Sequence, residues 1–195
     1  MTCIVAITDK KSIWMGADTM ISSPGIKLPL RNVPKIFDRE VEIIGKEPVR
    51  MLIGGCGHYK MIHILHYHLH PPAIDSDQTV DIWLGTTFTQ HIRQIFKDHA
   101  FMKEDDGAEH IPEGSLLVGM CGELRIFNDD LSSYEIDIPY ASIGSGESYA
   151  FGSLYSTRKL EMTPKKRIKE ALNAAAHFDP LVSAPFQIVG IQCQK

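Results

Sequence analysis

The sequence predicts an α+β fold built on antiparallel sheets, and three observations lead to that class. Strand-like runs open and close the chain, helix-like runs come in two pairs between them, and strand and helix do not alternate regularly. Runs of strands followed by runs of helices are typical of antiparallel sheets rather than of βαβ units. The chain has 195 residues and shows no internal repeat or linker, so we expect one domain over residues 1–195.

The N-terminal part has the clearest strand pattern. Residues 2–8 are apolar and largely β-branched, and residues 12–18 form a second apolar run. The short polar segment 9–11 between the two runs predicts a hairpin. Residues 22–34 contain three prolines and a glycine, which predicts a loop.

The other expected elements follow from spacing and from helix start and stop signals. Apolar residues three and four apart indicate helices, and Thr163-Pro164 is a favourable N-cap and first-turn pair. In the first half of the chain we expect short strands at 35–37 and 51–53, a break at 54–57, a helix at 58–70, a second helix within 81–102 and an acidic loop at 103–114. In the second half we expect three short strands within 115–143, a helix that begins after Gly146 and runs to about residue 159, a helix at 164–177 and a last strand at 186–193.

Composition excludes several classes of function. The formal net charge is −4 and no basic stripe is present, so we expect no nucleic-acid partner. No apolar run approaches the roughly 18 residues that span a bilayer, so we expect no membrane partner. The first ten residues lack signal-peptide features and the four cysteines are scattered, which favours a reduced, cytoplasmic protein.

A group of histidines raises the question of a metal site. His63, His66 and His70 would share one face of the expected helix, but no carboxylate or cysteine at suitable spacing completes a ligand set. A surface or subunit-interface helix is the favoured interpretation. We expect neither a metal nor a cofactor.

Thr2 is the first candidate for chemistry, because it directly follows Met1. Removal of Met1 would leave a threonine with a free α-amine, whose pKa is roughly 7.7–8.0. Such an amine can take the proton of its own residue's hydroxyl, so one residue supplies both nucleophile and base. On its own a Met-Thr opening is better explained as an ordinary first strand, because such openings are common.

Further segments along the chain resemble the proteasome β-type subunits and the peptidase subunit of the bacterial two-ring ATP-dependent protease, which are N-terminal nucleophile hydrolases. The first matching segments are Thr2–Ile7 and Met15–Asp18, in which Asp18 lies sixteen residues after Thr2. Next come Asn32–Phe37, which contains Lys35, and the pair Gly54-Gly55. The last is Ile143–Tyr155, which has the pattern Gly-Ser-Gly-x-x-Tyr-Ala. Lys35 lies one residue further along than is usual in the family.

The resemblance implies a set of catalytic residues. Thr2 would be the nucleophile, Asp18 would hold Lys35 charged, and the field of Lys35 would lower the pKa of the hydroxyl. Ser145 would position the Thr2 amine and the N–H of Gly54 would stabilise the oxyanion. Asp179 matches a supporting aspartate of the family, and Ser183, one residue too far along, is a weaker match to its serine partner.

The resemblance also implies a fold and an activity. The fold would be a four-layer αββα sandwich, with two antiparallel sheets between helix layers. The activity would be that of a threonine-type peptidase acting on peptides or unfolded proteins inside a homo-oligomeric ring, with an ATPase unfoldase as a possible partner. While Met1 is attached the Thr2 amine is an amide, so the protein would be inactive. Two alternatives stay open, a non-catalytic shell subunit of the same fold and an amidase acting on small amides.

Overall fold

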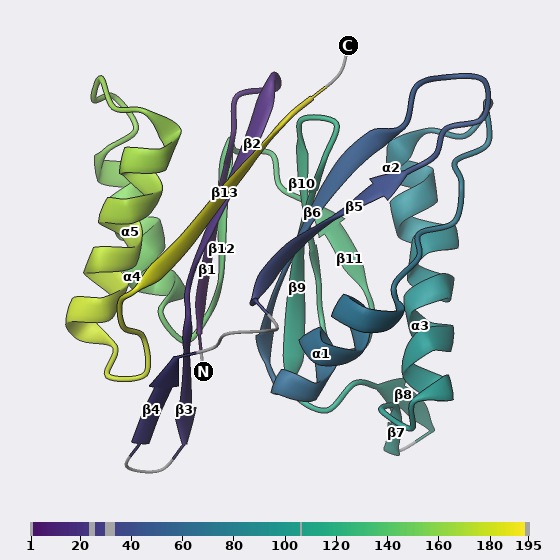
Figure 1. Cartoon of the computed structure of the whole chain (residues 1–195), viewed down its shortest axis with the longest axis horizontal. Coiled ribbons are helices and arrows are strands. Elements are labelled where there is room, and N and C mark those ends of the chain that lie inside the picture. The colour runs from purple at the N-terminus through teal and green to yellow at the C-terminus, as the bar shows by residue number, and fades with distance from the viewer. Residues whose placement is uncertain (1, 24–25, 30–33, 106, 194–195) are drawn as a thin grey trace.

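Two antiparallel sheets packed face to face form the centre of the molecule, and helices cover both outer faces (Figure 1). The computed structural model describes residues 2–23, 26–29, 34–105 and 107–193. The layers follow the order helices, sheet, sheet, helices. The expected αββα sandwich is therefore confirmed.

In the first sheet, the N-terminal strand is an inner strand. Its strand order is β12 (Tyr140–Gly144), β1 (Cys3–Thr8), β2 (Ser12–Asp18), β13 (Phe186–Gln192). The β1–β2 hairpin and the last strand were both expected from sequence. Strand β1 is paired with β12 on one side and with β2 on the other, which fixes its position in the sheet. Its first residue, Cys3, lies opposite Gly144 of β12.

The second sheet is formed by the middle of the chain. Its strand order is β11 (Ser133–Glu135), β10 (Glu123–Phe127), β9 (Gly114–Met120), β6 (Val49–Gly57), β5 (Ile36–Val41). Residues 115–143 thus contribute four strands, counting β12 of the first sheet, where three were expected. The expected break at 54–57 is wrong, because β6 continues to Gly57.

Two small hairpins stand where loops were expected. They are β3 (Met20–Ser23) with β4 (Ile26–Pro29), and β7 (Lys103–Asp105) with β8 (Ala108–His110). A proline is tolerated at the end of a two-stranded ribbon, where no ladder bond is lost, so the prolines of 22–34 did not exclude strands. Gly107 has a φ of 79°, which allows the tight turn between β7 and β8.

The helices form the two outer layers. The layer on the second sheet contains α1 (Tyr59–His68), α2 (Val80–Trp83), the π-helical turn η1 (Leu84–Phe88) and α3 (Thr89–Asp98), and the layer on the first sheet contains α4 (Glu147–Ser156) and α5 (Pro164–Phe178). The Thr163 hydroxyl accepts a hydrogen bond from the N–H of Lys166 at 3.3 Å, which is the predicted cap of α5. None of the helices in the described part of the chain is both long and apolar enough to cross a bilayer.

Three apolar clusters fill the spaces between the four layers. The middle cluster lies between the sheets and contains Ile4, Met15, Leu52 and Leu117, all of which are fully buried. Removal of this apolar surface from water is the main force that holds the sheets together. The sheets in turn fix the positions of the strand ends that form the site.

We expect Leu117→Ala to lower the free energy of unfolding by about 2–5 kcal/mol, because it removes buried methyl groups and leaves a cavity between the sheets. Urea denaturation measures the change. The matched control is Leu160→Ala, whose side chain is 56% exposed. An equal loss in both variants would show that the inter-sheet cluster does not dominate stability.

Candidate active site

Thr2 lies at the start of β1, at the junction of the two sheets. It is only 4% exposed, and its neighbour Cys3 donates its backbone N–H to Asp18 Oδ1 at 3.1 Å. Cys3 itself points away from the site into the cluster under α4 and α5, as the period-two rule predicts. Strand pairing and this hydrogen bond together fix where the chain enters β1.

Asp18 and Lys35 form a buried ion pair beside Thr2. Lys35 Nζ lies 2.8 Å from Asp18 Oδ2, and the two side chains are 7% and 0% exposed. Burial lowers the pKa of Lys35, and the negative charge of Asp18 offsets part of that effect. The backbone of Lys35 is also fixed, because its carbonyl accepts the N–H of Gly55 at 3.1 Å.

The segment between β12 and α4 packs against the other side of Thr2. The hydroxyl of Ser145 donates to the carbonyl oxygen of Thr2 at 3.4 Å. Gly144 has a φ of 101°, and a Cβ at that position would overlap the same carbonyl oxygen. A glycine is therefore required for this close approach, which accounts for the Gly-Ser-Gly pattern in physical terms.

Gly54 does not occupy the position expected of it. It lies inside β6 with Leu117 of β9 as its ladder partner, so the expected Gly-Gly turn before the helix is wrong. The N–H of Gly55 points to β5, where it bonds to Lys35. Since N–H groups alternate along a strand, the N–H of Gly54 is directed to β9 and not to Thr2.

Gly57 is the glycine that ends β6 and precedes α1. Its φ is 100°, and a Cβ there would overlap the carbonyl oxygen of Glu113. It lines both cavities that border Thr2. Sequence reasoning missed Gly57, although its position directly before His58, the N-cap of α1, was the available signal.

Asp179 and Ser183 lie behind the first sheet, at the end of α5. Asp179 is 6% exposed, and its Oδ1 accepts the N–H of Leu181 at 2.8 Å. Its Oδ2 and the hydroxyl of Ser183 are both buried and have no hydrogen-bond partner among the described residues. The charge of Asp179 contributes to the raised pKa of Cys3, whose main cause is burial, so Asp179 lies near the start of β1.

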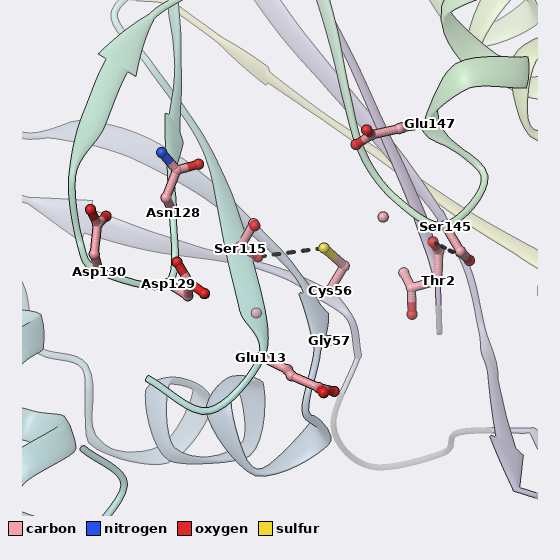
Figure 2. Close-up of a pocket in the computed structure, with 12 residues that line it drawn as sticks. Thr2, Cys56, Gly57, Glu113, Ser115, Asn128, Asp129, Asp130, Ser145 and Glu147 are labelled. Carbon is pink, nitrogen blue, oxygen red and sulfur yellow. Dashed lines mark hydrogen bonds between the residues drawn. The ribbon is translucent and has the colours of Figure 1, made fainter. Parts of the chain in front are cut away.

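Two cavities border Thr2. The smaller, of about 160 Å³, has a mainly apolar lining from β3 and α1, which includes Met20, Ile21, Met61 and Ile62. The larger, of about 520 Å³, lies between β9, the β10–β11 turn and the start of α4 (Figure 2). Thr2 thus has access to an apolar cavity on one side and a polar one on the other.

Solved structures share this architecture over nearly the whole chain. BPH of Thiobacillus denitrificans in complex with epoxomicin matches with a TM-score of 0.75 and 17% identity, covering 100% of both chains. HslV of Trypanosoma brucei matches with a TM-score of 0.62 and 12% identity, covering 98% of this chain and 99% of that one. The Anbu protein in a helical assembly from Pseudomonas aeruginosa matches with a TM-score of 0.64 and 11% identity, covering 98% and 81%.

This chain has the proteasome-type N-terminal nucleophile hydrolase fold. No protein-family model and no curated protein sequence matches it. The resemblance seen in the sequence is thus confirmed at the level of the fold. Met1, whose removal the implied activity requires, lies outside the described residues, as does Asn32, with which the Lys35 segment begins.

The histidines of α1 are spread over different environments within this fold. His63 lies between Tyr59 and Tyr67, with ring centroids 6.2 and 5.0 Å away, while His70 lies beyond the end of the helix. Among the described residues, no three His, Cys, Asp or Glu side chains are grouped as metal ligands would be. The ring contacts of His63 with Tyr59 and Tyr67 leave the interpretation of α1 as a surface or interface helix open.

We expect Asp18→Asn to lower the free energy of unfolding by about 3–5 kcal/mol, because it leaves the ammonium of Lys35 buried without a counter-charge. Asp38→Asn is the matched control, since Asp38 pairs with Arg50 at a similar 2.7 Å but both side chains are more than 40% exposed. That control should cost at most about 1 kcal/mol. Equal costs, measured by urea denaturation, would contradict the importance of the buried pair.

Proposed function

We propose that this protein is a threonine-type peptidase that hydrolyses peptide bonds through an acyl-enzyme on Thr2 once Met1 is removed. The observation that carries the proposal is the surroundings of Thr2. This buried residue directly precedes the central strand β1, borders two cavities, and lies beside the ion pair of Asp18 and Lys35. Burying an ion pair is costly, so its presence beside Thr2 favours a functional role over a purely structural one.

The reaction begins with attack of Thr2 Oγ on the substrate carbonyl. The Thr2 α-amine takes the hydroxyl proton as the new C–O bond forms, then gives a proton to the leaving nitrogen as the C–N bond breaks. Water then hydrolyses the ester, with the same amine as base. The nearby ammonium of Lys35 favours the alkoxide and opposes protonation of the amine, while Ser145 holds the Thr2 backbone.

In this proposal Gly57, and not Gly54, supplies the oxyanion donor. The N–H of Gly57 is directed to the same side of β6 as the N–H of Gly55, which is the side of β5. Strand β5, however, begins only at Ile36, so Gly57 lies past the end of the region that pairs with β5. Its N–H is therefore not used in the strand ladder and is placed at both cavities. A donor of this kind typically contributes about 3–4 kcal/mol to the transition state.

Asp179 and Ser183 are assigned a supporting role. Asp179 Oδ2 and the Ser183 hydroxyl are buried near the start of β1. The carboxylate could accept a hydrogen bond from the α-amine of Thr2 that removal of Met1 would expose, and the hydroxyl could accept from that amine or donate to it. This assignment would explain why these two buried polar atoms have no partner within the described part of the chain.

The enzyme is further proposed to act as a cytoplasmic homo-oligomeric ring on peptides or unfolded proteins, with an ATPase unfoldase as a possible partner. Large apolar side chains are exposed on the outer helices α4 and α5, with Tyr155 at 58% and Phe178 at 62%. Exposed aromatic groups of this kind are typical of interfaces. The Anbu protein of Pseudomonas aeruginosa, which has the same fold, forms a helical assembly.

We expect the mature chain, beginning at Thr2, to gain the mass of one epoxomicin molecule, because an epoxyketone reacts with both the hydroxyl and the free amine of the nucleophile. Intact-mass spectrometry before and after incubation measures this. Chain that keeps Met1 and the variant Thr2→Ala should both stay unlabelled. A mature chain that takes no label and cleaves no peptide would instead support the non-catalytic shell subunit.

We expect Gly57→Ala to slow labelling of the mature chain by about 100-fold, because the added Cβ forces the oxyanion N–H away from its position. The matched control is Gly152→Ala on α4, where a Cβ meets no other atom within 4 Å. Thermal unfolding of both variants separates a displaced donor from a lost fold. A Gly57→Ala protein that folds and labels at the normal rate would rule out this donor.

A further inference from the structure

The larger cavity beside Thr2 has a strongly acidic lining. Four carboxylates contribute to it, and none of its lining residues is a lysine, arginine or histidine; the four are Glu113, Asp129, Asp130 and Glu147. Figure 2 shows that Glu113 and Glu147 approach the cavity from opposite sides, while Asp129 and Asp130 lie at its far end. The cavity therefore presents negative charge in several directions around one volume.

The local structure fixes the backbone around three of these residues and the side chain of one of them. Glu147 is the first residue of α4, where the helix dipole stabilises a negative charge. Asp130 Oδ1 accepts the N–H of Ser132 at 2.8 Å, and hydrogen bonds to Ser132 lower the pKa of Asp130. The carbonyl of Asp129 accepts the N–H of Ile111 at 2.8 Å, which fixes the turn.

Two cations in this region, Lys35 and Arg93, already have acidic partners. Lys35 opens into the smaller cavity and is paired with Asp18 at 2.8 Å. Arg93 is near enough to contribute to the lowered pKa of Asp130, but its guanidinium lies 3.2 Å from Glu109. The acidic cavity thus lacks an internal counter-charge among the described residues.

A second observation, independent of the charge, connects this cavity to the proposed chemistry. Thr2 lines it together with Gly57, the proposed oxyanion donor, and Ser145. A substrate bound at Thr2 therefore has this cavity within reach.

We propose that the acidic cavity binds the leaving side of the substrate and selects peptides with lysine or arginine directly after the scissile bond. This inference rests on the proposed peptidase function. The smaller apolar cavity, at about 160 Å³, has room for one side chain of the acyl side. The fragment on the other side of the scissile bond must then enter the larger cavity, where its basic side chains meet Glu113 and Glu147.

The size of the preference follows from the exposure of the carboxylates. All four residues are solvent-exposed at the cavity rim, so each ion pair contributes only a modest factor of about 1.4 to 5 in binding. Two such contacts together give a factor of about 2 to 25, and the middle of that range, about 5- to 10-fold in kcat/KM at low salt, is the preference expected. Screening should reduce it strongly at 0.5 M salt, where the Debye length is only about 4 Å.

The experiment uses the mature full-length protein and three internally quenched peptides. One carries two arginines after the scissile bond, one carries two norleucines there, and one carries the two arginines before the bond. We expect the first to be cleaved 5- to 10-fold faster than the second at 20 mM salt, and the third to show no gain. The third peptide has the same charge as the first, so it separates the cavity from general attraction to an acidic protein.

Variants identify the residues responsible. Glu113→Gln combined with Glu147→Gln should reduce the ratio between the first two peptides to about 2 or less. Glu170→Gln, which removes an exposed carboxylate on α5 outside the cavity, should leave both the ratio and the activity unchanged.

The outcomes distinguish this inference from the proposed function. A protein that takes the epoxomicin label but shows no leaving-side preference, or prefers the arginines before the scissile bond, is a peptidase for which the inference is wrong. A protein that takes no label and cleaves none of the peptides overturns the proposed function and the inference together.

Discussion

The site depends on one buried carboxylate. Asp18 is fully buried, and its two oxygens accept hydrogen bonds from the N–H of Cys3 and from the ammonium of Lys35. Each of these partners belongs to a different element, so the carboxylate connects the start of β1, the end of β2 and the segment before β5. A buried charge is tolerated only when it is paired and hydrogen-bonded, so all three elements must be in place together. The placement of Thr2 therefore depends on the correct packing of these three elements.

The close approach of the sheets explains why the site forms at their junction. Gly144 of the first sheet brings its backbone against Thr2, and a Cβ there would also lie 3.3 Å from the Cβ of Cys56 on β6. Gly57, the last residue of β6, borders the same two cavities as Thr2. Small residues on both sheets allow the two backbones to meet at Thr2. The cavities lie on either side of this contact, which is how one residue comes to border both.

The sequence predicted what local signals determine. The β1–β2 hairpin and the cap of α5 rest on residues adjacent in the chain, and Asp18 and Lys35 were paired by their spacing within a family pattern. Which glycine ends β6 depends on strand register, because the segment from Gly54 to Gly57 offers three candidates. The acidic cavity could not be predicted, since its carboxylates come from two turns and the first residue of α4, which only the tertiary fold brings together.

Under the proposed function, the surroundings of Thr2, and not intrinsic reactivity, would make it the nucleophile. Cys56 lines both cavities, and a thiolate is a stronger nucleophile than a hydroxyl. Burial, however, raises the pKa of Cys56 to about 11 and that of Cys3 to about 12, so both thiols stay protonated near neutral pH. In the proposed mature chain Thr2 would have what these cysteines lack, a base within its own residue. That base appears only when the bond to Met1 is cut, so a single cleavage would turn a buried strand end into the reactive group between two cavities of opposite character.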